Sequence, residues 1–178
     1  MIGQQNWGAV AQCHMNRFDC ECFMVGKIIW SNEQWFLLHC ISPHAHWDGF
    51  ALLSQAELHD LQIESAYCKK LLSILNLRNE KQSISPCIKS NPVYDIFDYA
   101  KSNNFSVALE LCQSTVNDVI GKIINYSDGV VQIQQFDDDA NMDGESWITV
   151  DKITGIIVES EELEFIDIAI LSTCDLSI

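Results

Sequence analysis

The chain contains an internal repeat. Residues 25–72 align with residues 120–167 at a constant offset of 95, without a gap, over 48 positions. The aligned residues are identical at nine positions: Gly26/Gly121, Lys27/Lys122, Ile28/Ile123, Ile29/Ile124, Ala45/Ala140, Asp48/Asp143, Gly49/Gly144, Glu64/Glu159 and Ser65/Ser160. Because no insertion interrupts the match, every strand and loop has the same length in both copies. We therefore expect two compact domains of one architecture.

The second copy predicts a helix followed by five short strands. Asn91-Pro92 supplies an N-cap and a proline at the first helical position, and apolar residues then recur at helical spacing. The expected strands cover residues 105–111, 119–126, 130–136, 147–150 and 153–159. This pattern indicates a mainly β fold with short helices (α+β), in which each five-stranded antiparallel sheet curls into a small barrel.

The segments that follow each copy set the expected domain limits. Residues 66–77 are expected to form a helix that starts after Ser65, whereas residues 161–171 carry a pattern that suits either a helix or a strand. The polar segment 79–91 is expected to be a linker. We predict a first domain over residues 1–78, a linker over 79–91 and a second domain over 92–178.

Two segments of the second copy, VIGKIINYSDGVVQI (119–133) and ESWITVDKITGIIVES (145–160), carry a family resemblance. Together with the preceding helix they resemble the Sm-like family, whose fold is a five-stranded SH3-like barrel. The Asp-Gly turn and the late Ile-x-x-Ile strand are also similar to uncharacterised bacterial proteins of that fold. The resemblance implies two tandem Sm-like barrels related by internal duplication.

The resemblance does not extend to the loops that bind RNA in Sm-like proteins. That family uses an Asp and an Asn after the second strand and an Arg-Gly turn before the last. The matching loops here read Tyr126-Ser127-Asp128-Gly129 and Val150-Asp151-Lys152, without the Asn or the Arg. Since the chain has a net charge of −15, we expect no nucleic-acid binding by the usual Sm route.

The negative charge is concentrated in the second half. Residues 1–89 contain seven Lys or Arg against eight Asp or Glu, a net of −1, whereas residues 90–178 contain three against seventeen, a net of −14. A field of this sign favours basic partners. An acidic surface is also what keeps an ordinary soluble protein in solution, and the sequence leaves both interpretations open.

Several function classes lack their motifs. The chain has no Gly-rich phosphate loop, no Gly-x-Ser-x-Gly and no His-Glu-x-x-His, so we predict a protein that is not an enzyme and has no cofactor. No apolar run has the length of a membrane span, and the N-terminus has no signal-peptide pattern. The eight cysteines do not recur between the copies, which favours reduced thiols and a cytoplasmic location without membrane association.

Aromatic and acidic residues supply the candidate binding residues. Trp30, Trp35 and Trp47 enrich the first copy, and tryptophan is frequent at the energetic centres of interfaces. Asp137 and Asp138 belong to the acidic second copy. The tryptophans suit either a partner surface or a contact between the two domains.

A metal-like spacing occurs between the third and fourth strands of both copies. The second copy has Asp139, Asn141 and Asp143 before a glycine, which resembles the start of a calcium loop but lacks the glutamate at its twelfth position. The residues at the same places in the first copy are His44, His46 and Asp48, which suit a transition metal. The alternative is a hairpin loop whose shared Asp-Gly serves backbone geometry.

Three functions follow from these features. We expect a non-catalytic protein-interaction or assembly module with a basic protein partner, and we leave homo-oligomerisation open. The first alternative is an acidic inhibitor or immunity protein that neutralises a basic, nuclease-like toxin. The second alternative is a metal-binding protein that uses the loops between the third and fourth strands.

Overall fold

The computed structural model describes residues 1–16, 21–111, 118–137 and 139–175. The chain divides into two compact units, Met1–Ser85 and Pro86–Ile178. Both are mainly β with short helices, so the α+β class is confirmed. In the part of the chain that is described, no helix is both long and apolar enough to cross a bilayer.

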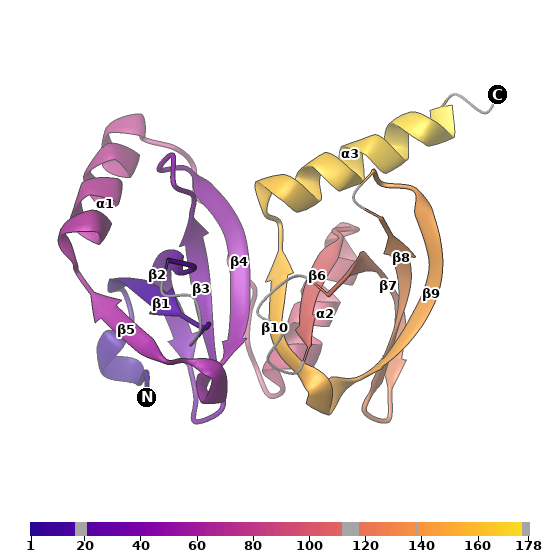
Figure 1. Cartoon of the computed structure of the whole chain (residues 1–178), viewed down its shortest axis with the longest axis horizontal. Coiled ribbons are helices and arrows are strands. Elements are labelled where there is room, and N and C mark those ends of the chain that lie inside the picture. The colour runs from indigo at the N-terminus through magenta and orange to yellow at the C-terminus, as the bar shows by residue number, and fades with distance from the viewer. Residues whose placement is uncertain (17–20, 112–117, 138, 176–178) are drawn as a thin grey trace. The chain divides into compact units, whose positions relative to one another are not determined.

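The first unit is a curved antiparallel sheet with one α-helix (Figure 1). Its strand order is β5-β1-β2-β3-β4. Its elements are the 3-10 turn η1 (Gln4–Asn6), β1 (Val10–His14), β2 (Met24–Ser31), β3 (Trp35–Ile41), β4 (Trp47–Ser54), the 3-10 turn η2 (Gln55–Glu57), β5 (Asp60–Ile63) and α1 (Ala66–Arg78).

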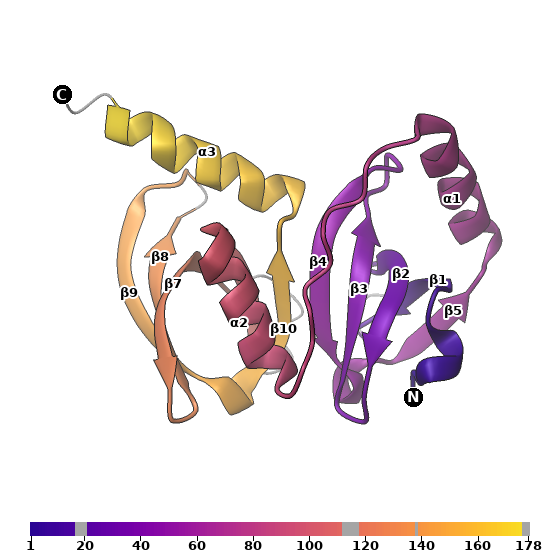
Figure 2. The ribbon, with the colours of Figure 1, turned by 180° about the vertical axis from the view of Figure 1, so that it is seen from behind.

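The second unit repeats this topology behind an added helix, with the strand order β10-β6-β7-β8-β9. Its elements are α2 (Pro92–Asn103), β6 (Val107–Leu111), β7 (Val119–Ser127), β8 (Val130–Phe136), β9 (Met142–Thr149), the 3-10 turn η3 (Val150–Lys152), β10 (Ile153–Val158) and α3 (Glu161–Asp175). Seen from behind, α2 lies along β7 and β10 (Figure 2). At the start of the first unit only the short η1 precedes the first strand.

The two units agree residue by residue at the offset of 95. The register shift between Ile28 and Trp30 in β2 recurs between Ile123 and Asn125 in β7. Left-handed backbone conformations recur at Ala45/Ala140, Gly49/Gly144 and Glu64/Glu159. Three of the nine identical pairs therefore fall at these unusual backbone positions, where side chains are restricted.

Gly26 and Gly121 are conserved between the units because a neighbouring backbone passes close to them. A Cβ atom on Gly26 would lie 2.7 Å from the carbonyl oxygen of His39, and one on Gly121 would lie 2.1 Å from that of Gln134. Only glycine allows the second and third strands to approach this closely where the sheet bends.

Each helix that follows the fifth strand packs on an equivalent core. In the first unit, this cluster contains Val25, Ile41, Ala45, Cys68 and Leu71. In the second, the residues at the same offset are Ile120, Phe136, Ala140, Leu163 and Ile166. Burial of these side chains removes apolar surface from water and fixes both helices over one end of their sheets.

Two elements differ from the expectation. The fourth strand of the second unit begins at Met142 and not at Trp147, because Phe136 of β8 already pairs with Met142. Residues 161–171, whose pattern suited either structure, form the helix α3. Ser160 starts it, since its Oγ accepts the backbone N–H of Leu163 at 3.3 Å.

Candidate functional site

Helix α3 exposes large apolar side chains on the side away from its core. Phe165, Ile168 and Leu171 are 65%, 59% and 64% exposed, and they are spaced by three residues. This spacing places them in one continuous band, called the exposed band below. On the other side of the helix, Leu163 and Ile166 are each 2% exposed. The helix is therefore apolar on two sides, although only one side is packed against its sheet.

The equivalent helix of the first unit shows that the exposed band is not needed for the fold. The residues of α1 at the offset of 95 are Lys70, Ser73 and Asn76, and all three are exposed. At the positions that face the core, both helices are apolar. Since the same architecture forms with polar residues on α1, the exposed band of α3 has to be explained by something other than folding.

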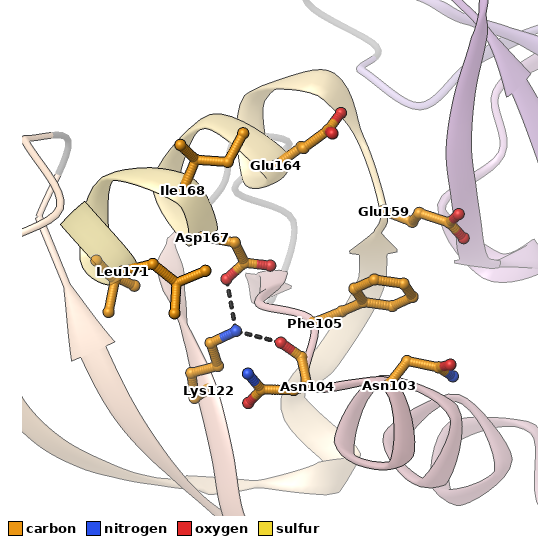
Figure 3. Close-up of a pocket in the computed structure, with 10 residues that line it drawn as sticks. Asn103, Asn104, Phe105, Lys122, Glu159, Glu164, Asp167, Ile168 and Leu171 are labelled. Carbon is orange, nitrogen blue, oxygen red and sulfur yellow. Dashed lines mark hydrogen bonds and ion pairs between the residues drawn. The ribbon is translucent and has the colours of Figure 1, made fainter. Parts of the chain in front are cut away.

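A pocket of about 320 Å³ lies beneath this helix, inside the second unit (Figure 3). Ile168 and Leu171 of α3 line one side. Phe105, just before β6, and Asn103, at the end of α2, line the other. Ile168 and Leu171 therefore belong both to the exposed band and to the wall of the pocket. A concave surface of this kind is the usual form of a binding site.

A network of polar contacts closes the floor of the pocket. Lys122 Nζ lies 2.6 Å from Asp167 Oδ1 and also donates to the carbonyl oxygen of Asn104. Asp167 accepts two further hydrogen bonds from Ser106, from its N–H at 3.0 Å and from its Oγ–H at 2.6 Å. These contacts fix α3 to β7 and to the residue just before β6, and they satisfy the charge of Asp167 within the unit.

The rim of the pocket is acidic. Glu159 follows β10, and its Oε2 accepts a hydrogen bond from the Tyr99 hydroxyl at 2.7 Å. Burial, followed by this bond to a carboxylate, raises the pKa of Tyr99, so the hydroxyl stays a donor. Glu164 stands on α3 and is exposed. Because Lys122 and Asp167 balance each other, Glu159 and Glu164 set the sign of the local field.

The three predicted tryptophans are half-buried in three different strands: Trp30 in β2, Trp35 in β3 and Trp47 in β4. The ring of Trp47 stacks on His39 with centroids 3.9 Å apart. His39 also stacks on Phe50, and burial, followed by the charge of Lys27, lowers its pKa to about 4. Trp47 thus packs within its own unit. A binding role for the three residues stays a prediction.

The loops with metal-like spacing are held by side chain to backbone hydrogen bonds. Asp137 Oδ1 accepts the backbone N–H of Asp139 at 3.0 Å and that of Asn141 at 2.8 Å. The backbone and side-chain bonds from Asn141, followed by the bond from Asp139, lower the pKa of Asp137. Ser42, at the same place in the first unit, accepts the backbone N–H of His46 at 3.2 Å. In both loops, therefore, one side chain closes the turn.

The proposed ligands are divided between the loops and the strands that follow them, and metal binding by them stays a prediction. Asp48 and Asp143 lie inside β4 and β9, and His46 Nδ1 is 2.5 Å from Glu80 Oε1. His44 is exposed, and Asp138 falls outside the described residues. Among the residues that are described, no three His, Cys, Asp or Glu side chains are grouped so that they could hold a metal ion. The loop contacts supply a structural reason for the shared spacing.

The exposed band was missed by sequence reasoning, although the repeat carried the signal. The offset of 95 pairs Lys70 with Phe165 and, when it is continued beyond residue 72, Ser73 with Ile168 and Asn76 with Leu171. Because the pattern of residues 161–171 suits either a helix or a strand, the difference between polar residues in the first copy and apolar residues in the second was not evident. No protein-family model, curated protein or solved structure matches the chain. The residues of the site are therefore the basis for a function of this chain.

Proposed function

We propose that the protein is a non-catalytic, cytoplasmic interaction module made of two tandem Sm-like barrels, and that it binds a protein partner through α3. The observation that carries the proposal is the exposed band, which replaces the polar face of the equivalent helix α1. A contiguous apolar surface rimmed by charged residues is typical of protein-binding sites.

The strand order supports the barrel interpretation. In both units the fifth strand pairs with the first, and the others follow in sequence to the fourth. A glycine marks the bend of the second strand, and a 3-10 turn precedes the last strand. These are features that the Sm-like resemblance implies. The contrast between α1 and α3 supports placing the proposed binding role in the second unit.

Site-specific photocrosslinking in the cells that make the protein tests the proposal. Benzoylphenylalanine in place of Ile168 should give a protein adduct of discrete mass, because this position would lie in the interface. The matched control has the same probe in place of Ser73, the exposed position of α1 at the offset of 95. Equal adducts at both positions, or a lipid adduct at Ile168, would contradict the proposal.

A further inference from the structure

The pocket beneath α3 has an apolar lining of limited size. Phe105, Ile168 and Leu171 form its apolar walls, and its volume is about 320 Å³. Sites for drug-sized ligands range from about 300 to 1,000 Å³, so this one lies at the small end. It is large enough to admit an apolar side chain of a larger partner whose remaining contacts lie outside, on the exposed band.

The charged side chains of the pocket favour a partner that carries positive charge. Asp167 is already paired with Lys122 and hydrogen-bonded to Ser106. Glu164 stands at the pocket on the same helix as Ile168 and Leu171. An incoming cation can therefore reach the Glu164 carboxylate while an apolar group occupies the pocket.

We propose, on the basis of the function proposed above, that the α3 site binds a basic amphipathic polypeptide segment. An apolar side chain of this segment enters the pocket between Phe105 and Leu171, and further apolar side chains cover Phe165 and Ile168. A lysine or arginine next to the inserted side chain pairs with Glu164. The net charge of −14 over residues 90–178 favours the encounter with such a partner.

The same charges disfavour the other occupants. A second copy of the chain would bring two surfaces of like charge together, including two Glu164 carboxylates. Nucleic acids and anionic bilayers carry the same sign as the second unit, so the long-range field repels both. A basic protein segment satisfies both the apolar band and the acidic rim.

Two synthetic helical peptides test separately how apolar contact and charge contribute to binding at α3. Both peptides carry leucine on one face. One peptide carries lysine on its polar face, and the other carries glutamate. Binding of each to the full chain is measured by fluorescence anisotropy at low and high salt. We expect the leucine–lysine peptide to bind at least tenfold more tightly, with an affinity that falls as salt increases.

Two charge-reversal variants then locate the contact. Glu164→Lys should weaken binding of the leucine–lysine peptide at least tenfold. The matched control, Glu162→Lys, changes the net charge equally, but Glu162 is exposed two positions away and does not line the pocket. It should change the affinity by less than threefold. An equal effect of both reversals would overturn the assignment, because it would show a nonspecific charge effect.

The outcomes test separately which class of partner binds and whether α3 is the docking site. If both peptides bind equally and Leu171→Asn abolishes binding, α3 is a docking site but its partner need not be basic. If neither peptide binds although Ile168 crosslinks to a protein, the partner class is wrong and the proposed function stands. If neither peptide binds and no protein crosslinks, both proposals are wrong.

Discussion

Replacement of Glu110 by glutamine should change how stability depends on pH. Glu110 lies in β6, is only 6% exposed, and its carboxylate packs so closely over Gly155 of β10 that a Cβ atom there would lie 2.5 Å from Oε2. Burial, followed by the charge of Asp118, raises the pKa of Glu110 from 4.5 to about 7. The folded protein therefore holds this proton over a range in which the unfolded chain releases it.

The sign and size of the effect follow from proton linkage. The contribution of Glu110 to stability is complete below about pH 4.5 and is lost as the pH rises through about 7. At about 1.4 kcal/mol for each pKa unit, the full loss is about 3 kcal/mol, of which about 2 kcal/mol falls between about pH 5.5 and 8.5. Glutamine stays neutral throughout. Over this pH range the free energy of unfolding of Glu110→Gln should therefore rise by about 2 kcal/mol relative to that of the wild type.

Urea denaturation of both proteins at several pH values measures this difference directly. The expected result is a gap between the free energies of unfolding that widens as the pH rises. Asp118→Asn is the companion variant: it removes the second cause of the raised pKa, so the widening should become smaller. A gap that stays constant from about pH 5.5 to 8.5 would show that Glu110 does not hold its proton in the folded state.

The repeated backbone features lead to two further predictions. Gly26→Ala and Gly121→Ala should both lower the free energy of unfolding, with the larger loss at Gly121 because the neighbouring carbonyl oxygen is closer there; denaturation curves that match the wild type would refute the close approach. Asp137→Ala should lower the thermal midpoint more than Ser42→Ala, since the carboxylate accepts two backbone N–H groups and the hydroxyl accepts one. The Asp137 effect should disappear in strong acid, where the carboxylate is protonated; the same midpoint for both variants at neutral pH would contradict this account.

The parts of the fold that the sequence predicted well are those fixed locally. The Asn91-Pro92 start of α2, the bend at Gly121 and the Asp-Gly turn after β7 each depend on a few neighbouring residues. The constant offset of 95 then carried the strand lengths of one copy to the other. Repetition thus strengthened local signals that are weak when each occurs once.

The candidate site was harder to predict because distant residues create it. Lys122 and Asp167 are 45 positions apart, and only the packing of α3 brings them within 2.6 Å. The exposed band also made the helical periodicity of the sequence harder to recognise. With apolar residues on both sides of α3, the stretch 164–171 lost the periodicity that identifies a surface helix. The feature that suggests binding was therefore the same feature that concealed the helix.

The stability of a variant in which α3 carries the exposed residues of α1 shows whether the exposed band is a free surface. In the triple variant Phe165→Lys, Ile168→Ser and Leu171→Asn, each replaced side chain is about 60% exposed, so the free energy of unfolding should fall by no more than about 3 kcal/mol. A loss above about 4 kcal/mol, as expected for three packed side chains, would contradict this expectation. The exposed band would then belong to the core, and α3 would have no free surface to offer a partner.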